Sequence, residues 1–288
     1  MAAIPPPRII PRNRSEQVRR ANLNASWHHD LYHRSLTLPW WVFLMIGCTV
    51  YLVVNLIFAC LYLIEPGSIA GASGGFADAF FFSIQTIATI GYGVMSPATF
   101  WCNTLVTLET MTGLVFLALA TGVTFARISR PTARVMFADV AVIAPHNGVP
   151  TLSFRLGNER RSQIIEADVA VTLLRFETSI EGETMRRFHD LALLRSHTPV
   201  FALTFTIMHP IDEHSPLYGA TAESLMAEDA ELLISVTGLE EVTSQTVHAR
   251  RSYRAEEVRF SHRFADIFAR DENGRVIDYA AFHQTVPI

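Results

Sequence analysis

The chain has 288 residues, half of them hydrophobic, and a formal net charge of −4 at pH 7. This length holds one large domain or two modest ones, and the mean hydropathy of +0.25 is high for a soluble protein. The net charge says little about partners, and we expect no nucleic-acid partner.

Charged residues and cysteines are unevenly distributed along the chain. Between residues 35 and 126 the only charged side chains are Glu65, Asp78 and Glu109. The chain therefore divides into a basic N-terminal segment, a membrane hairpin and a soluble C-terminal half. All three cysteines fall in or beside the apolar segments, so the soluble half has neither a disulfide framework nor a thiolate metal site.

The N-terminal segment has two parts. Residues 1–26 combine prolines with scattered arginines and lack the features of a cleavable signal peptide, so we expect a flexible basic arm. In residues 27–38, apolar side chains such as Trp27 and Tyr32 alternate with polar ones. That pattern is typical of a short amphipathic helix on the membrane surface, an interfacial slide helix, although a plain linker would show it too. Pro39 ends this segment.

Residues 39–131 are predicted to form a transmembrane pore domain. Two apolar runs, residues 40–64 and 103–126, are each long enough to cross a bilayer of about 30 Å, which takes about 20 residues. Between them, residues 76–88 predict an apolar helix that is too short to cross and is therefore re-entrant. Asp78 falls in its first turn, where a carboxylate favours the positive end of the helix. The opposite end of this pore helix would face the membrane centre, where its partial negative charge favours a cation.

The stretch Thr89-Ile90-Gly91-Tyr92-Gly93 follows this helix directly. Glycines on both sides of one aromatic residue permit alternating signs of the backbone angle φ, so that successive carbonyls point towards one axis. One chain supplies one wall, and four walls would form rings of carbonyl oxygens that replace the water shell of K⁺. A simple glycine turn would also contain G-Y-G. Irregular backbone at membrane depth must line a cavity or be buried, and the motif resembles the selectivity filter of potassium channels.

Arginines flank the two spans and are absent between them. Those before the first span are Arg8, Arg12, Arg14, Arg19, Arg20 and Arg34, and those after the second are Arg127, Arg130 and Arg134. The connecting residues 65–102 contain no arginine. The positive-inside bias therefore predicts a multi-pass membrane protein with both termini in the cytoplasm.

The soluble half, residues 132–288, is predicted to be a β-sandwich. Many short runs of β-type composition argue for an antiparallel sandwich, with hairpin turns at Asn147-Gly148 and Asn273-Gly274. One helix is expected over Ala222–Met226, with Thr221 as its N-cap. The predicted strands cover residues 137–144, 150–156, 164–175, 185–194, 200–208, 231–237, 242–250, 257–260 and 263–268.

Three stretches of the soluble half carry a second resemblance. They are Arg155-Leu156-Gly157-Asn158, residues 209–218 (HPIDEHSPLY) and His262-Arg263-Phe264, and they resemble the cytoplasmic domain of inward-rectifier potassium channels. The short termini and the absence of a cysteine pair in the loop between the spans resemble the bacterial KirBac branch, which implies the inner (plasma) membrane of a bacterium. The resemblance implies a fold of membrane α plus soluble β: a two-span potassium-channel pore with a re-entrant pore helix, followed by a cytoplasmic immunoglobulin-like β-sandwich. It also implies a homotetramer that conducts K⁺ passively, with K⁺ as the permeant ion and no cofactor.

The resemblance also assigns roles to single residues. Thr89 to Gly93 match the filter, Phe125 matches the bulky residue of a gate at the inner helix crossing, and Arg127 and Arg130 match residues that contact anionic lipid headgroups. A loop that narrows the cytoplasmic vestibule, and contributes to gating, matches Gly238, Leu239, Glu240, Glu241, Val242, Thr243, Ser244, Gln245 and Thr246.

Two departures from the family pattern have consequences. Leu117 stands where strongly rectifying members carry an acid, so weak rectification is expected. Gln85 and Val94 stand where eukaryotic members have an acidic–basic pair beside the filter, so a different brace is needed. Leu117, Thr121 and Phe125 share one helical stripe, with Gly113 a turn earlier. That stripe either lines the cavity or packs on the first span, and the family position favours the pore for Phe125.

Glu109 has two interpretations. A carboxylate inside a membrane segment is expensive and marks a functional site, so it either lines the pore or lies hydrogen-bonded behind the filter. For the whole chain, the alternative to a channel is a membrane-anchored β-sandwich that binds a partner or senses a signal without conduction. An enzyme is not expected, because the sequence shows no nucleophile elbow, metal cluster or phosphate-binding glycine loop.

Overall fold

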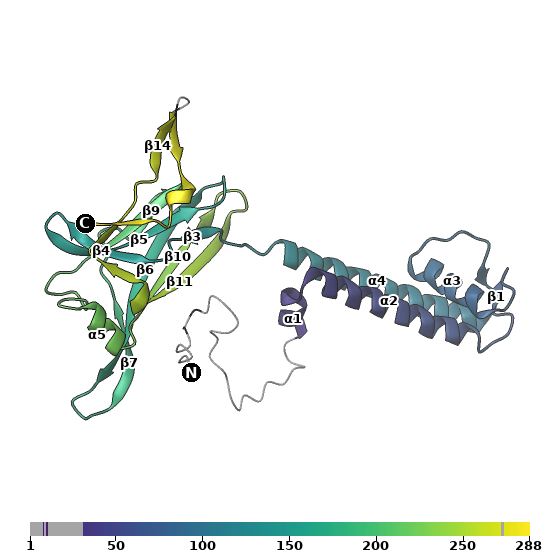
Figure 1. Cartoon of the computed structure of the whole chain (residues 1–288). Coiled ribbons are helices and arrows are strands. Elements are labelled where there is room, and N and C mark those ends of the chain that lie inside the picture. Colours follow the sequence, from purple (N-terminus) through teal and green to yellow (C-terminus); the bar gives the residue numbers. More distant parts are fainter. Residues whose placement is uncertain (1–7, 9, 11–30, 272–273) are drawn as a thin grey trace, which may run out of the picture. The chain divides into compact units, whose positions relative to one another are not determined.

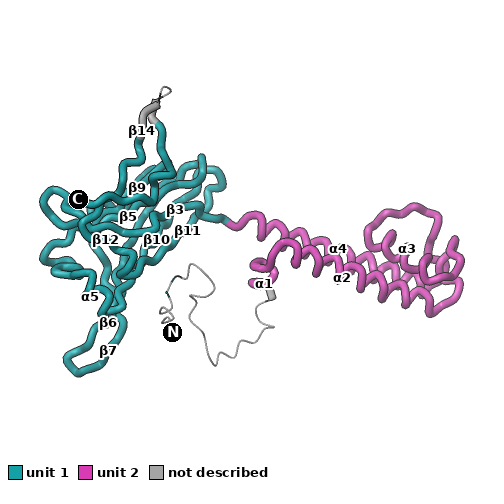
Figure 2. Tube along the Cα trace, in the orientation of Figure 1, with its two compact units in different colours: residues 1–21, 131–288 teal, residues 22–130 magenta. Residues whose placement is uncertain are grey.

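The structure is a computed structural model and describes residues 8, 10, 31–271 and 274–288. The chain divides into two compact units at Arg130 and Pro131, and Figure 2 colours them separately. The described part of the helical unit is residues 31–130. The β-rich unit comprises residues 131–288 together with the N-terminal residues Arg8 and Ile10.

The helical unit consists of two long helices with a short one near one end. Figure 1 shows the two long helices side by side, with α3 at the end of the pair away from α1. Both long helices are apolar and long enough to cross a membrane, whereas α3 is too short to do so. The elements are α1 (Leu31–Thr37), α2 (Trp40–Tyr62), β1 (Ile69–Ala70), α3 (Phe76–Ile87), β2 (Ser96–Pro97) and α4 (Phe100–Ile128).

The helix bounds differ from the prediction in ways that local chemistry explains. The first span ends at Tyr62 rather than at residue 64. A turn follows around Pro66 and Gly67, and Gly67 has a φ of +78°. The second begins at Phe100 because the Thr99 hydroxyl caps it by accepting from the Cys102 N–H at 3.2 Å. That helix continues to Ile128, beyond the apolar run on which the prediction depended. The predicted slide helix over 27–38 appears as α1, and residues 27–30 lie outside the described residues.

The β-rich unit is a sandwich of two five-stranded sheets. One sheet has the order β12-β4-β5-β3, with β9 also paired to β5, and the other has the order β11-β10-β6-β7, with β8 also paired to β6. The strands of the first are β3 (Val135–Phe137), β4 (Ala141–His146), β5 (Val149–Asn158), β9 (Thr204–Pro210) and β12 (Val258–Phe260). Those of the second are β6 (Ile164–Thr178), β7 (Thr184–Asp190), β8 (His197–Phe201), β10 (Glu231–Glu240) and β11 (Gln245–Arg254).

Smaller elements complete the unit. They are α5 (Ala222–Ala227), the 3₁₀ turns η3 (Ala255–Glu257) and η4 (Tyr279–Ala281), and the pairs β13 (His262–Phe264) with β16 (Thr285–Pro287) and β14 (Phe268–Asp271) with β15 (Gly274–Ile277). Alternate residues of the facing strands fill one core between the two sheets, including the fully buried Leu152 and Phe154 of β5 and Ile234 of β10. The predicted β-sandwich is confirmed.

Three predicted strands are wrong, because each run spans two separate strands. The run 200–208 is two strands in different sheets, because β8 pairs with β6 whereas β9 pairs with β5. The run 137–144 covers the end of β3 and the start of β4, which lie in the same sheet, and the run 263–268 covers β13 and the start of β14. In 200–208, continuous β-type composition hides the point where the chain crosses from one sheet to the other. The sandwich is also not purely antiparallel, since β12 runs parallel to β4.

Local turn and cap signals gave accurate predictions. Asn147 and Gly148 both have positive φ, +52° and +84°, in the tight turn between β4 and β5. Thr221 and Ser224 form a reciprocal capping box at the start of α5, with hydrogen bonds of 3.2 and 3.0 Å. The turn predicted at Asn273-Gly274 falls partly outside the described residues, although β14 and β15 pair on either side of it.

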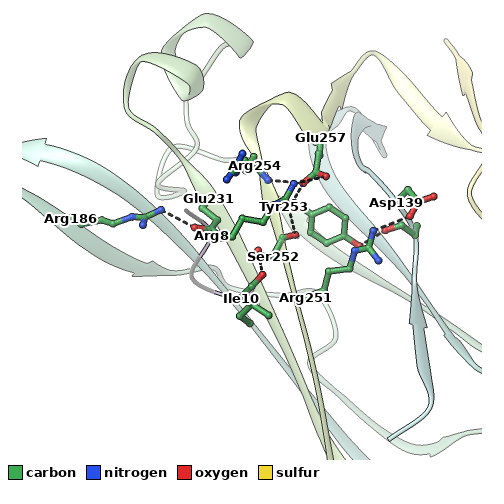
Figure 3. A network of polar contacts seen from close by, with 11 residues as sticks. Arg8, Ile10, Asp139, Arg186, Glu231, Arg251, Ser252, Tyr253, Arg254 and Glu257 are labelled. Carbon is green, nitrogen blue, oxygen red and sulfur yellow. Dashed lines mark hydrogen bonds and ion pairs between the residues drawn. The ribbon is translucent and has the colours of Figure 1, made fainter. Parts of the chain in front are cut away.

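The N-terminal residue Arg8 is bound to the β-sandwich by a polar network (Figure 3). Its guanidinium donates two hydrogen bonds to the Glu257 carboxylate in a bidentate arrangement, at 2.8 and 3.0 Å, and one to the Ser252 carbonyl at 3.2 Å. Glu257 also accepts from the Arg254 N–H at 3.0 Å, and the Ser252 hydroxyl donates to the Ile10 carbonyl at 3.3 Å. The Arg8 side chain is only 8% exposed, so this part of the predicted arm is fixed on β11 and η3.

We predict that Arg8→Gln lowers the midpoint of thermal unfolding of the β-sandwich. The substitution removes charged hydrogen bonds worth about 1.5–3 kcal/mol and leaves the mostly buried Glu257 without this partner. The check is a thermal unfolding series of the purified full-length protein with Arg8→Gln, Glu257→Gln and the double variant. Arg250→Gln, at an exposed position of β11, the strand that Arg8 contacts at Ser252, is the matched control. Equal effects of Arg8→Gln and Arg250→Gln would contradict the prediction.

Candidate ion-conduction site

The C-terminal end of α3 determines the backbone of the segment that follows it. The Ile90 N–H donates to the Gln85 carbonyl at 2.9 Å, and the Thr89 N–H donates to the Thr86 carbonyl at 3.0 Å. These are the two hydrogen bonds of a Schellman motif, in which the residue after the cap takes the left-handed conformation. Thr89 occupies that position with φ of +55°. Glycine is usual there, and a β-branched residue at positive φ is an outlier that stores strain.

The predicted filter segment has the alternating backbone that its glycines suggest. Thr89, Gly91 and Gly93 have φ of +55°, +63° and +81°, whereas Ile90 and Tyr92 between them are not among the positive-φ residues. A Cβ atom added to Gly91 or Gly93 would meet nothing within 4 Å. Glycine is therefore required here for backbone conformation and not for space.

The side chains of this segment are exposed in the single chain. Tyr92 is 70% exposed and Ile90 is 45% exposed. Large apolar side chains at membrane depth need apolar or protein surroundings. Their exposure in the single chain is expected if neighbouring chains cover these side chains in an assembly.

The loop before α3 and the segment after the filter are held together at one close approach. A Cβ atom at Gly71 would lie 2.1 Å from the Val94 carbonyl oxygen, so only glycine fits at this position. The short β1–β2 ladder continues the contact, pairing Ile69 with Pro97. The Glu65 carboxylate also accepts from the Thr99 hydroxyl at 2.8 Å. Backbone pairing and close packing thus brace the segment after Gly93, at the place where Gln85 and Val94 led us to expect a brace other than an ion pair.

One face of α4 packs on α3. Its buried residues Cys102, Leu105, Glu109 and Gly113 recur every three or four positions, as one helical face does. A Cβ atom at Gly113 would lie 2.8 Å from the Ile87 carbonyl oxygen, so the absence of a side chain lets α4 approach the last turn of the pore helix. Gly113, at the start of the predicted pore stripe, is therefore a packing residue.

The remaining residues of that stripe are exposed in the single chain. Leu117 is 63% exposed, Phe125 is 70% exposed, and Thr121 is also exposed. None of them packs into a core cluster of the described residues. They are free to face either a central pore or a neighbouring chain.

Glu109 is fully buried and hydrogen-bonded, not exposed on the pore stripe. Its carboxyl group contacts the Tyr62 hydroxyl at 2.5 Å and the Ser83 hydroxyl of α3. Of the two interpretations of Glu109, these contacts support the one in which it lies hydrogen-bonded behind the filter.

The C-terminal end of α4 is fixed to α1. Arg127 donates to the carbonyls of Ser35 and Leu38, the latter at 2.6 Å. Its guanidinium also lies 4.6 Å from the Trp40 ring centroid. Arg130 donates to the Leu36 carbonyl at 3.3 Å and is exposed. The two arginines therefore donate to carbonyls in the last turn of α1 and to the carbonyl of the residue that follows it, where helical partners run out. The sequence did not predict this role, because the pairs are about ninety residues apart.

The predicted constriction loop Gly238–Thr246 needs correction. Residues 238–240 belong to β10 and residues 245–246 to β11, so only Glu241–Ser244 form the turn of a hairpin. Gly238 faces β6 at a bulge, where an added Cβ atom would lie 2.5 Å from Ile164 Cγ2. The apolar side chain at the tip, Val242, is 77% exposed.

Glu240 closes this hairpin and is nearly inaccessible to solvent. Its carboxylate accepts from the Ser162 hydroxyl at 2.5 Å, and from the Thr243 N–H and hydroxyl at 2.7 and 2.8 Å. These hydrogen bonds, the one from Ser162 first, lower the pKa of Glu240 to about 2. Its charge is used to hold the turn, while the neighbouring Glu241 is exposed. The described residues contain no cluster of His, Cys, Asp or Glu side chains that could bind a metal ion.

Comparisons with known proteins agree with these features. The family model described as inward rectifier potassium channel C-terminal domain matches residues 135–288, and the ion channel model matches residues 39–130. The inward rectifier potassium channel Kirbac3.1 of Paramagnetospirillum magnetotacticum is 46% identical over 281 residues, covering 96% of this chain and 95% of that protein. This chain belongs to the inward-rectifier potassium channel family. The resemblance to the bacterial KirBac branch is confirmed, and the chain is a membrane protein of the channel class.

More distant relatives come from vertebrates. The ATP-sensitive inward rectifier potassium channel 12 of Mus musculus is 29% identical over 98% of this chain and 72% of its own length. The inward rectifier potassium channel 4 of Rattus norvegicus is 31% identical, with the same coverage. Among solved structures, the sporulation control protein Spo0M of Bacillus subtilis is 10% identical, covers 44% of this chain and 49% of its own, and has a TM-score of 0.22. That likeness is too weak to bear on the fold.

Proposed function

We propose that the chain forms a homotetrameric pore that conducts K⁺ passively and selectively, with Thr89, Ile90, Gly91, Tyr92 and Gly93 as the filter. The alternation of positive φ at Thr89, Gly91 and Gly93 is the observation that carries this proposal. Such alternation turns successive carbonyls to one side, and rings of carbonyls replace the hydration shell of the ion. K⁺ is the permeant ion, and the mechanism needs no cofactor.

Assembly as a tetramer is supported by the single filter segment of each chain and by the apolar surfaces that one chain leaves exposed. One filter segment supplies one wall of a pore, and the apolar side chains of α2 and α4 are largely exposed in the single chain. The bilayer and the neighbouring copies cover these surfaces in the proposed assembly. In the proposed assembly both termini lie on the cytoplasmic side of a bacterial inner membrane, and the arginine distribution supports this orientation.

The gate in this proposal is Phe125. The outer half of α4 is packed on α3 through Glu109 and Gly113, whereas Phe125 lies near the other end of the helix and is exposed. Four such rings would make a narrow apolar constriction, which stops ions by dewetting. Leu117 and Thr121 line the cavity between gate and filter, and the absence of an acid at Leu117 gives weak rectification. The hairpin of Glu240 to Thr246 contributes a second constriction from the β-sandwich.

The competing function, a membrane-anchored β-sandwich that binds a partner or senses a signal without conducting, has less support. Such an anchor has no use for a re-entrant helix that ends in a strained residue at Thr89. The family comparison also places the helical unit within the ion channel model.

The first prediction concerns selectivity. Gly91→Ala places a side chain at φ of +63°, which costs about 1–2 kcal/mol per residue in the left-handed region and distorts the carbonyl ring. We expect loss of K⁺ over Na⁺ discrimination, measured as ion flux into liposomes. The control is Gly47→Ala, at a helical position of α2 where an added Cβ atom meets nothing within 4 Å. Unchanged discrimination in Gly91→Ala would refute the filter assignment.

The second prediction concerns the gate. Phe125→Ala shortens four side chains at the constriction, so resting K⁺ flux should rise while selectivity is kept. Leu119→Ala, at an exposed position on another face of α4, is the control and should not raise the flux. If Phe125 instead packs against a neighbouring helix, the tetramer loses thermal stability without added flux, and the gate assignment fails.

The third prediction concerns lipid. Arg130 is exposed at the end of α4, where a basic residue gains about 1 kcal/mol from an anionic membrane surface. Arg130→Gln should weaken the response of K⁺ flux to added phosphoinositide and lower thermal stability in detergent less than Arg127→Gln does, because Arg130 makes one hydrogen bond of 3.3 Å from an exposed position. Arg127→Gln should lower that stability, because it also removes the hydrogen bond to Leu38. An unaltered lipid response in both variants would place the headgroup site elsewhere.

A further inference from the structure

A chain of buried polar side chains joins the three helices that surround the filter end of the helical unit. Asn55 and Tyr62 come from α2, Ser83 from α3 and Glu109 from α4. Asn55, Ser83 and Glu109 are fully buried, and Tyr62 is 1% exposed. One chain alone encloses the group, so its environment does not depend on neighbouring copies. Buried polar atoms require hydrogen-bond partners. Each contact in this chain therefore needs one proton between its two heavy atoms.

The contacts of Asn55 fix the orientation of its side-chain amide. Its amide nitrogen donates to the Tyr51 carbonyl at 2.8 Å. Because a carbonyl only accepts, the amide nitrogen must face Tyr51, and the amide oxygen therefore faces Ser83, at 3.0 Å.

Ser83 has one hydroxyl proton and contacts two oxygen atoms. One is the Asn55 amide oxygen, which only accepts, so the hydroxyl proton goes there. The other is Glu109 Oε1. For that contact to be a hydrogen bond, the proton must come from the carboxyl group. Tyr62 then donates its hydroxyl proton to Glu109 Oε2 at 2.5 Å. This arrangement satisfies every contact, whereas an ionised Glu109 would compete with Asn55 for the Ser83 proton.

We propose that Glu109 is a neutral carboxylic acid that holds the pore helix in position. It donates to Ser83 and accepts from Tyr62, so it connects α3 with α2 and α4 at one point. No ion pair involving Glu109 is found among the described residues, and a buried carboxylate without a cation is strongly disfavoured. This role deepens the proposed function and depends on it, because the positioned element carries the filter.

The geometry explains how the acid reaches the filter. Glu109 and Gly113 are one turn apart on α4, and their partners Ser83 and Ile87 are one turn apart on α3. Two successive turns of α4 therefore fix two successive turns of the pore helix, the second of which leads into Thr89. The Tyr62 ring also packs edge-on against Phe82, with centroids 5.1 Å apart. Glu109 is thus a positioning residue for the filter, although it does not line it.

The test compares Glu109→Gln with Glu109→Leu in the full-length protein in liposomes. Glutamine keeps one donor and one acceptor, so it should retain K⁺ over Na⁺ discrimination within about twofold. Leucine has a similar volume but neither group, and it should reduce discrimination by about tenfold or more, as expected for a lost buried hydrogen bond. If glutamine loses as much discrimination as leucine, Glu109 is an ionised double acceptor and the proposal is overturned. Equal discrimination in all three proteins overturns it as well.

An infrared measurement tests the proton directly. At pH 8 exposed carboxyl groups are ionised, so the carbonyl stretching band of a protonated carboxylic acid should appear in the native protein and disappear in Glu109→Gln. Absence of that difference band overturns the proposal. This result does not depend on conduction: native protein that fails to discriminate K⁺ from Na⁺ refutes the proposed function, whereas the band and thermal stability still decide the state of Glu109. If Glu109→Leu fails to assemble, Ser83→Ala replaces it and should give the same loss of discrimination.

Discussion

A threonine held in the left-handed backbone region at the end of the pore helix is the constraint on which the proposed conduction site depends. Thr89 is β-branched and has φ of +55°, a conformation that costs about 1–3 kcal/mol. The hydrogen bonds from Thr89 and Ile90 to the last turn of α3 oppose that cost. Because the helix ends in this way, the next residues start with the alternation that Gly91 and Gly93 continue. Any shift of α3 would be transmitted to the filter backbone.

The protein holds α3 with small residues and hydrogen bonds. Gly113 lets α4 approach Ile87, Gly71 lets the outer loop approach Val94, and Glu109 binds Ser83. These contacts involve the outer half of α4. The inner half keeps its apolar residues exposed in the single chain, and its end is fixed to α1 by Arg127. The half of α4 near α3 therefore keeps the proposed filter in place, whereas the other half is exposed in the single chain. In the proposed channel, selectivity and gating would then depend on different halves of one helix.

Local signals in the sequence predicted a large part of this architecture. Hydropathy identified both spans and the short helix between them, and the glycines around Tyr92 predicted the alternating backbone. The hairpin at Asn147-Gly148 and the cap at Thr221 also followed from residues adjacent in sequence. The positive φ of Thr89 was not predictable from propensity, since threonine disfavours it and the end of the helix imposes it.

Contacts between distant residues account for what the sequence did not predict. Arg127 binds α1 across about ninety residues, and nothing near it in sequence indicates those partners. Glu240 was predicted to lie in a loop. It is instead the last residue of β10, and it accepts a hydrogen bond from the Ser162 hydroxyl, 78 positions away, which holds the hairpin turn. The strand predicted over 200–208 failed because β-type residues continue through Ala202 and Leu203, where the chain changes sheets. The proton count at Glu109 likewise needs the three-dimensional positions of Asn55 and Ser83.

In the proposed channel, four copies of the Thr89–Gly93 backbone together select K⁺. The most direct measurement is the reversal potential of current through the purified native protein in a planar bilayer, with K⁺ on one side and Na⁺ at equal concentration on the other. A K⁺-selective pore should give a reversal potential displaced strongly in the direction set by the K⁺ gradient. A reversal potential near zero, with current carried equally by both ions, would contradict it.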